Sequence, residues 1–241
     1  MARIGTSGWS YAHWEGVLYP PGLPAAERLA HYWAEFDTVE LNASFYRWPP
    51  PARFSSWRDR LPDGFEMTVK APRGLTHARR LYAPEPWIER IEAGLHELSG
   101  RRGPLLVQLH PSMQRDDARL DWFLRHLPSW TRPVVEFRHE SWNDEAVFRL
   151  LEHRGAGYCV MSGARLPCVL RATSPLVYVR LHGPDQDHLY GGSYSDGDLR
   201  WWADRILEWE AAGQSVYAYF NNDGEGRAVR NARTLRSFLR S

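Results

Sequence analysis

The sequence is poor in lysine, cysteine, net charge and long apolar runs, and each shortage argues against a class of protein. Of its 30 basic residues only Lys70 is a lysine, and the formal net charge is +1. This balance gives no general attraction to nucleic acid or to an anionic membrane surface. The two cysteines, Cys159 and Cys168, form neither a CxxC pair nor a disulfide framework, which is typical of a reducing compartment.

No apolar run is long enough to cross a bilayer, and the N-terminus begins with a strand-like segment rather than a signal peptide. We therefore expect a cytoplasmic globular protein without a membrane partner. A chain of 241 residues can bury a large core. We expect a single domain over residues 1–241.

Strand-like and helix-like segments alternate along the chain. The expected strands span 3–6, 38–42, 65–70, 104–109, 133–138, 157–161, 176–182 and 215–220. The expected helices span 25–35, 54–60, 84–98, 116–127, 143–153, 196–212 and 226–239, with Gly100 and Asn143 as caps. The stretch 162–175 has no helical pattern.

Eight strands separated by helices predict an α/β fold, a TIM-type (β/α)8 barrel with an irregular unit after strand six. A doubly wound open sheet is the alternative, but no GxGxxG follows the first strand. Active sites of such barrels lie at the carboxyl ends of the strands. The residues at those ends are therefore the candidates for function.

The inward-facing side chains become polar toward the carboxyl end of most strands. They are Glu40 and Asn42, Thr68 and Lys70, Gln108 and His110, Glu136 and Arg138, Tyr178, Arg180 and His182, and Tyr217, Tyr219 and Asn221. A structural barrel would place Val, Ile or Leu there, and the alternative is a plug of ion pairs such as Glu40–Lys70 or Glu136–Arg138. We favour a functional site with Glu40, Lys70, Glu136 and His182 as candidate catalytic residues.

Lys70, the lone lysine, falls in this polar row. Lysine differs from arginine because burial can lower its pKa and because its ammonium is a compact donor. It could serve as general base, Schiff-base nucleophile or anion clamp. The expected proximity of Glu40 on the next strand would keep Lys70 charged, so we favour a clamp or proton donor.

The loops above the strand ends supply further candidates for substrate binding. Trp9, Tyr11, Tyr46 and Tyr190 offer flat surfaces that suit sugar rings or nucleobases, whereas Trp14 and Trp48 are expected to pack the loops. The polar candidates are Asn42, Gln108, Arg138, Arg180, Asn221 and Asn222. The glycine-rich loops after strands seven and eight are typical of a phosphate site, which favours an anionic ligand.

Several motifs resemble one known family. GTSGWSYAHWEGVLYPPGLP, FDTVELNASFYRWP, FEMTVKAPRGLTH, VEFRHESW, RLHG and YFNND follow one another in the order found in the YecE-like family, also called domain of unknown function seventy-two. The resemblance spans nearly the whole chain. It implies a TIM-type barrel and a bacterial or archaeal cytoplasmic protein, and it implies no particular reaction.

Three functions remain open. The first is an enzyme that uses Glu40 and Glu136 as acid and base on a small polar substrate, either anionic (for example phosphorylated) or sugar-containing. The barrel glycosidase pattern places its acids on strands four and seven, where this chain has Gln108 and His182. Schiff-base aldolases commonly carry their lysine on strand six, so Lys70 departs from that pattern too.

The second function is a metal-dependent phosphodiesterase or endonuclease with Glu40, Glu136 and His182 as ligands of a divalent metal. No HxH or HExxH is present, and nearby cations would repel a metal, so we predict no cofactor and no metal ligand. The third function is a non-catalytic protein that binds a nucleotide or single-stranded nucleic acid through loop aromatics and arginines. The sequence carries no signal for an oligomeric state.

Overall fold

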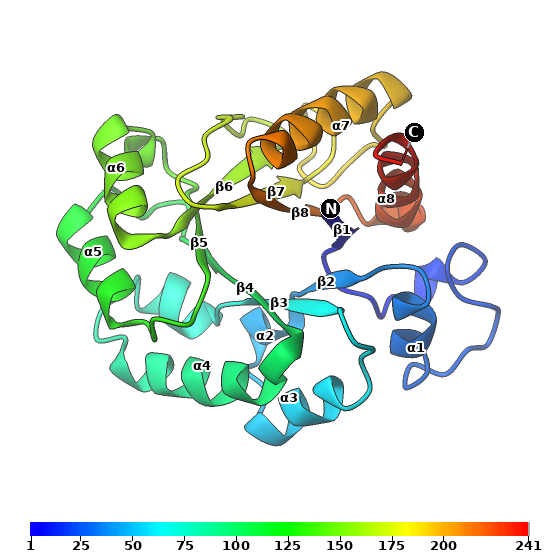
Figure 1. The fold of residues 1–241 in the computed structure, drawn as a ribbon, viewed down its shortest axis with the longest axis horizontal. Coiled ribbons are helices and arrows are strands. Elements are labelled where there is room, and N and C mark those ends of the chain that lie inside the picture. The colour runs from blue at the N-terminus through cyan, green and yellow to red at the C-terminus, as the bar shows by residue number, and fades with distance from the viewer. Residues whose placement is uncertain (241) are drawn as a thin grey trace. The chain divides into compact units, whose positions relative to one another are not determined.

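The fold is an α/β barrel of the TIM type, as the alternation of strands and helices predicts. In this computed structural model, which describes residues 1–240, eight strands form a parallel sheet in the order β1-β8-β7-β6-β5-β4-β3-β2. A bridge between Ser7 and Glu40 links the first and last strands of that order. Figure 1 shows how helices separate the strands along the chain.

All eight expected strands are present. They are β1 Arg3–Thr6, β2 Thr38–Leu41, β3 Glu66–Lys70, β4 Arg102–Gln108, β5 Pro133–Glu136, β6 Gly157–Ser162, β7 Leu176–Leu181 and β8 Ser215–Phe220. Asn42 was expected in a strand, but its φ of −87° and ψ of −23° are helical and place it at the start of a short helix. The aromatic turn after β2 is therefore partly helical.

The helices also follow the expected order. They are α1 Arg28–Trp33, α2 Ala43–Tyr46, α3 Pro51–Arg58, α4 Glu85–Leu98, α5 Asp117–His126, α6 Glu145–Arg154, α7 Asp196–Ala211 and α8 Arg227–Phe238. Residues 163–175 form no helix, as expected. No helix among residues 1–240 combines the length and the apolar character that a membrane crossing needs.

Two expected helix caps were wrong by one residue. Asp144, not Asn143, caps α6, because the Asp144 carboxylate accepts the Ala146 N–H at 2.8 Å. Asn143 instead ends the preceding 3-10 turn, where its backbone N–H donates to the Glu140 carbonyl. Ser99, not Gly100, ends α4 with a left-handed φ of 47°. Gly100 instead lies inside the 3-10 turn Ser99–Arg101.

The chain divides into two compact units, which we call the terminal unit and the central unit. The terminal unit comprises Met1–Glu40, Val160–Leu170 and Leu176–Ser241, and the central unit comprises Leu41–Cys159 and Arg171–Pro175. The terminal unit therefore combines stretches from both ends of the sequence. The central unit is nearly continuous.

The terminal unit is held together by pairing of β1 with β8 and of β8 with β7. Ile4 lies beside Ala218, which in turn lies beside Val179. Trp14 is completely buried among aromatic rings, and its indole N–H donates to Asp223 Oδ1 at 2.7 Å. The expectation that Trp14 packs its loop is confirmed, and this contact fixes the β1 loop against the β8 loop.

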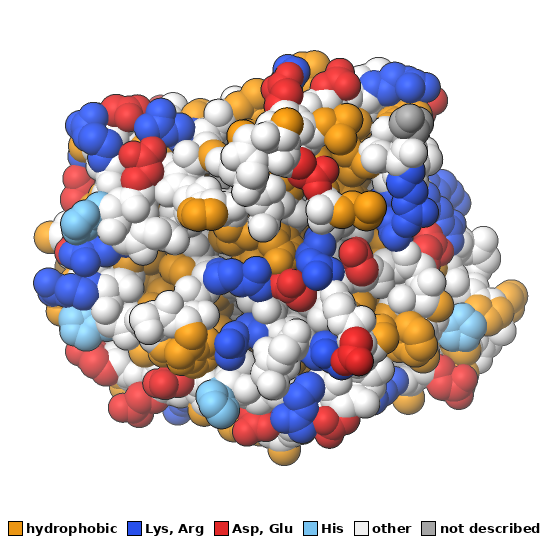
Figure 2. Space-filling view, in the orientation of Figure 1, with side chains coloured by type: hydrophobic (Ala, Val, Ile, Leu, Met, Phe, Trp, Pro, Cys, Tyr) orange, Lys and Arg blue, Asp and Glu red, His pale blue; other side chains and the backbone are white. Residues whose placement is uncertain are grey.

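Helix α8 carries a row of arginines that joins it to α1. Arg233 binds both oxygens of Glu35, at 2.5 and 2.7 Å, and Arg236 lies over the Phe36 ring at 5.3 Å. Figure 2 shows the Lys and Arg side chains over α8 at the right of the view. Arg233 and Arg236 line a cavity of about 710 Å³ together with Ala34, Glu35, Ser237 and Arg240. These contacts give the arginines a structural role.

The central unit packs β3, β4 and β5 under α3 to α6. Leu105, Leu106 and Val107 are fully buried. Gly103 must be glycine, because a Cβ there would lie 2.7 to 2.9 Å from the backbone of Met67 and Thr68 in β3. The Trp48 ring packs on the Phe54 ring with centroids 5.4 Å apart, and its indole N–H donates to the Arg90 carbonyl. Both contacts confirm its expected packing role.

Candidate functional site

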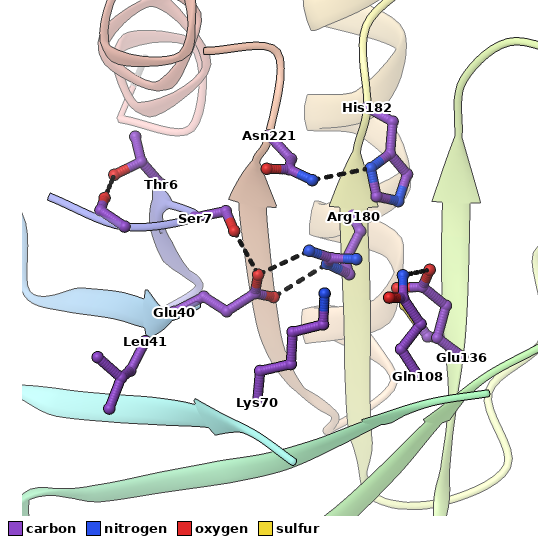
Figure 3. A network of polar contacts seen from close by, with 12 residues as sticks. Thr6, Ser7, Glu40, Leu41, Lys70, Gln108, Glu136, Arg180, His182 and Asn221 are labelled. Atoms are coloured by element: carbon purple, nitrogen blue, oxygen red, sulfur yellow. Dashed lines mark hydrogen bonds and ion pairs between the residues drawn. The ribbon is translucent and has the colours of Figure 1, made fainter. Parts of the chain in front are cut away.

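In the terminal unit, Glu40 is the centre of a buried polar network at the end of β2. Its Oε1 accepts from Ser7 Oγ at 2.6 Å and from an Arg180 terminal nitrogen at 2.7 Å. Its Oε2 accepts from Tyr178 Oη at 2.6 Å and from Arg180 Nε at 3.0 Å. Figure 3 shows Ser7 and Arg180 converging on the carboxylate. Four donors therefore occupy a carboxylate that is completely buried.

The elements of the barrel place these donors. Tyr178 and Arg180 are two residues apart on β7, so their side chains lie on the same face of the strand and reach one carboxylate. Burial, with the nearby Glu40 charge second, raises the pKa of Tyr178 well above its ordinary value. Tyr178 therefore stays a neutral donor, and the network consists of one anion, one cation and two hydroxyls.

His182 and Asn221 lie beside each other just after β7 and β8. The Asn221 amide nitrogen lies 3.2 Å from His182 Nδ1, as Figure 3 shows. His182 is fully buried, and the Tyr190 ring meets it edge-on with centroids 5.3 Å apart. The three predicted site residues His182, Asn221 and Tyr190 are thus brought together. A His Nδ1 that accepts from an amide carries its proton on Nε2.

Asn222 links the loops after β7 and β8. Its amide nitrogen donates to the Gly192 carbonyl at 3.1 Å and to Asn231 Oδ1 at 2.9 Å. Its own Oδ1 is buried and, among the described residues, accepts no hydrogen bond. The donors of Asn222 hold loop structure, and only its oxygen is available to a ligand.

The β1 loop holds Trp9 and Tyr11. Tyr11 donates to the Ser7 carbonyl at 2.8 Å and packs on Trp14 with ring centroids 5.0 Å apart. The Trp9 carbonyl accepts from Tyr19. Tyr11 therefore fixes the backbone of Ser7, which in turn bonds Glu40.

In the central unit, Glu136 ends β5 and is fully buried. Its Oε1 accepts from Gln108 Nε2 at 2.6 Å and from Arg138 Nε, and its Oε2 lies 3.9 Å from Cys159 Sγ. Figure 3 shows Gln108 and Glu136 side by side. The register explains the first contact, because Gln108 and Glu136 are direct partners in the β4–β5 pairing. The Glu136–Arg138 ion pair, which the sequence analysis gave as part of the alternative of a structural plug, is present.

Lys70 ends β3 and is only 6% exposed. Its ammonium lies 4.2 Å from the centre of the Phe45 ring, a distance at which the ring face attracts a cation. Its backbone carbonyl accepts from Ser44 Oγ at 2.7 Å, which fixes the end of the strand. The expected pairing of Lys70 with Glu40 stays a prediction.

His77 is a site residue that the sequence analysis missed. It lies in the π-helical turn Gly74–Ala78 after β3, and such turns often occur at functional sites. Its ring meets Phe45 edge-on at 4.9 Å and His110 at 5.1 Å. Burial and then the charges of His110, Lys70, Arg73 and Arg138 lower the pKa of His77 to about 4. His77 is therefore neutral at pH 7.

Two predicted residues lie in or beside α2. Tyr46 is 74% exposed and touches Phe45 edge-on. Asn42 has a buried Oδ1 that accepts no hydrogen bond from the described residues. The structure thus leaves an aromatic surface and an amide oxygen close to the end of β2. Among residues 1–240, no group of three or more His, Cys, Asp or Glu side chains could hold a metal ion.

Comparison with known proteins gives one family. The family model described as Protein of unknown function DUF72 matches residues 3–241. The chain belongs to the DUF72 family. The resemblance indicated by the sequence motifs is thereby confirmed.

Several known proteins match this chain over nearly their full length. The UPF0759 protein YunF of Bacillus subtilis (strain 168) is 27% identical over 271 residues, covering 99% of this chain and 95% of that protein. A crystal structure of a DUF72 family protein from Thermotoga maritima MSB8 is 28% identical, with a TM-score of 0.91 and complete coverage of both chains. A DUF72 family protein from Enterococcus faecalis V583 has the same fold, with a TM-score of 0.86 at 19% identity.

The motifs quoted for the DUF72 resemblance include some residues of both polar networks, whereas Tyr178, Gln108 and Cys159 lie outside them. TVELN supplies Glu40, VEFRH supplies Glu136 and Arg138, and VKAPRGLTH supplies Lys70 and His77. A strand-alternation rule could not find His77, because it lies in a helical turn beyond the strand. The histidine in GLTH, so close to the lone lysine, was the signal available in the sequence.

Proposed function

We propose that this DUF72 protein is an enzyme that binds a small anionic substrate at the carboxyl ends of β3, β4 and β5 and acts on it by acid–base chemistry. The observation that carries the proposal is the positive surroundings of His77. The groups that act most strongly on its charge are His110, Lys70, Arg73 and Arg138, all of them cationic when charged. A phosphate or carboxylate group would be attracted to this place.

The geometry around Lys70 supports the proposal. The lysine is buried, faces the Phe45 ring, and follows a strand whose end Ser44 fixes. Arg138 is held on its Nε side by Glu136, so its orientation is set before a ligand arrives. Cations held in place in a partly buried site bind oxyanions at a lower entropic cost than mobile surface cations.

The two buried glutamates suit different roles. Glu40 accepts four hydrogen bonds, and a proton could reach it only if one of them broke. We propose that Glu40 is an anchor that orients Arg180, Tyr178 and Ser7 rather than the general acid or base. The sequence analysis proposed Glu40 as an acid or base, and the role proposed here replaces that one. The reaction is then proposed to occur at the anion site around Lys70 and His77.

Binding of small anions tests the proposed function. Inorganic phosphate, sugar monophosphates and neutral sugars are titrated into the protein by calorimetry at low and moderate salt. We expect the phosphorylated compounds to bind, and Lys70→Gln to weaken their binding by about tenfold or more, as loss of a charged hydrogen bond does. Arg53→Gln, an exposed arginine in α3, is the matched control and should leave binding unchanged.

The same titration can contradict the proposal. Equal binding of neutral and phosphorylated sugars would show that charge is not recognised. Equal binding by the wild type and by Lys70→Gln would show that this lysine is not the clamp. A substrate found by this screen would then be incubated with the protein, and turnover measured against pH.

A further inference from the structure

His77, which the sequence analysis missed, has a second histidine, His110, beside it. His77 follows β3, and His110 follows β4. Their rings meet edge-on with centroids 5.1 Å apart. Both side chains are half-buried, so each has one side in the protein and one side toward solvent.

The protonation of His110 is fixed by Ser112. The Ser112 backbone N–H donates to His110 Nδ1 at 3.0 Å, and the Ser112 hydroxyl lies 2.9 Å from the same nitrogen. A backbone N–H can only donate, so His110 Nδ1 is the accepting nitrogen. The neutral ring then carries its proton on Nε2, which is a hydrogen-bond donor.

His77 has the opposite arrangement. Its Nδ1 lies 3.0 Å from Thr76 Oγ1, and the Thr76 hydroxyl itself donates to the Pro72 carbonyl at 3.3 Å. The hydroxyl has a single proton, and when that proton goes to the Pro72 carbonyl, His77 Nδ1–H is the donor to Thr76 Oγ1. His77 Nε2 is then a lone pair, and a neutral histidine of this tautomer can accept a proton there.

The loop beside the pair is unusually constrained. Arg80, Leu81 and Ala83 have φ values of 48°, 65° and 39°, in the left-handed region that non-glycine residues rarely adopt. Such strain persists only where the surroundings enforce it. Here Arg80 donates to Ser112 Oγ at 3.0 Å, so the strained loop supports the serine that orients His110.

We propose that His77 and His110 form the acid–base pair of this site. Nε2 of His77 accepts the proton of a substrate hydroxyl, and Nε2–H of His110 donates a hydrogen bond to a neighbouring oxygen of the same substrate. The O–H bond breaks, its electron pair stays on the substrate oxygen, and His77 becomes an imidazolium. The substrate carries a phosphate or carboxylate group, a requirement that rests on the proposed function.

The anionic group also has a part in the chemistry. Without ligand, His77 is a weak base, because burial and the four neighbouring groups His110, Lys70, Arg73 and Arg138 disfavour its protonation. Of the other groups near the pair, Glu136 is engaged by Arg138, while Phe45 and Thr76 are uncharged. An oxyanion placed near Lys70, Arg73 and Arg138 offsets their field and makes His77 a stronger base, so the substrate activates its own catalyst.

Nitrogen-15 NMR of histidine-labelled full-length protein tests the pair directly. We expect unprotonated signals from His77 Nε2 and His110 Nδ1 in the ligand-free protein, assigned with His77→Asn and His110→Asn. Sulfate should raise the pKa of His77 from about 4 to above about 5, the shift that a nearby opposite charge produces. Formate is titrated in parallel, and the anion that binds more tightly identifies the substrate group as tetrahedral or planar.

The outcomes separate the two proposals. A proton on His77 Nε2, or none on His110 Nε2, overturns the acid–base pair whether or not an anion binds. Sulfate binding that depends on Lys70 but leaves the pKa of His77 at about 4 overturns the activation and leaves anion binding standing. Failure of both anions to bind overturns the proposed function and the substrate class, while the tautomers still decide the pair.

Discussion

At the scale of single residues, the two buried glutamates are alike in the sequence and different in the structure. Glu40 has hydroxyl, phenol and bidentate guanidinium donors around both oxygens. Glu136, in contrast, accepts from Gln108 and from Arg138 on the same oxygen, Oε1. Strand alternation places both carboxylates inward, but it contains no information about which donors surround them.

Replacing Glu40 should destabilise the protein strongly. Glu40→Gln removes the charge that the buried Arg180 faces, and breaking such a pair costs about 3 to 5 kcal/mol. Urea unfolding measures the loss. Tyr178→Phe is the matched comparison, because it removes one hydrogen bond of the same carboxylate and should cost about 1.5 to 3 kcal/mol. Equal losses for the two variants would contradict the central role of the ion pair.

His77 should make stability depend on pH. Its pKa is about 4 in the folded protein and close to 6.5 when unfolded, so the unfolded state binds the proton first. The contribution of His77 to stability is therefore fully present above about pH 6.5 and is lost as the pH falls toward 4. His77→Asn should flatten the fall in unfolding free energy over this window.

The control for this pH dependence is His153→Asn. His153 is exposed on α6, and its removal should leave the slope of stability against pH unchanged. The free energy of unfolding of the wild type and both variants is measured at about pH 4.5, 5.5, 6.5 and 7.5, which covers that window. A slope that survives in His77→Asn would assign the dependence to another group.

At the scale of elements, the sequence predicted most of the strands and helices, because their signals are local. Alternating apolar residues are sufficient to place β3 and β8, a short apolar run places β4, and β8 has the expected bounds. The caps were less predictable. Asn143 and Asp144 are both good capping residues, and only the 3-10 turn before α6 decides between them. The His77–His110 contact joins two separate loops, and no local pattern contains it.

The α6 cap offers a test at this scale. Asp144→Ala should destabilise the protein by about 1 kcal/mol, because it removes the acceptor of the Ala146 N–H and a negative charge at the helix start. Asn143→Ala should cost less, since the Asn143 side chain does not cap the helix. Chemical denaturation of both variants measures the difference, and a reversed order would restore Asn143 as the cap.

At the scale of the whole molecule, the boundary between the two units cuts through strands. The division falls between Glu40 and Leu41, inside β2, and between Cys159 and Val160, inside β6. A strand cannot keep half its residues ordered while the other half unfolds without losing its pairing. We therefore expect one cooperative unfolding transition, in keeping with the single domain that the chain length favours.

Native-state hydrogen exchange tests this expectation. The amides of β1 in the terminal unit and of β4 in the central unit should exchange with the same free energy of opening. Two distinct plateaus, one for each unit, would show that the units unfold independently.

The pairing of β1 with β8 has a consequence for how the protein is made. Because a chain is synthesised from its N-terminal side, residues 3–6 are made well before their β8 partners at 217–220. Until then β1 has an unpaired edge, and such edges are prone to wrong association. The nearly continuous central unit meets no such delay. A nascent chain of this protein therefore needs β1 to be protected, by chaperones or by other parts of the chain, until β8 has been synthesised.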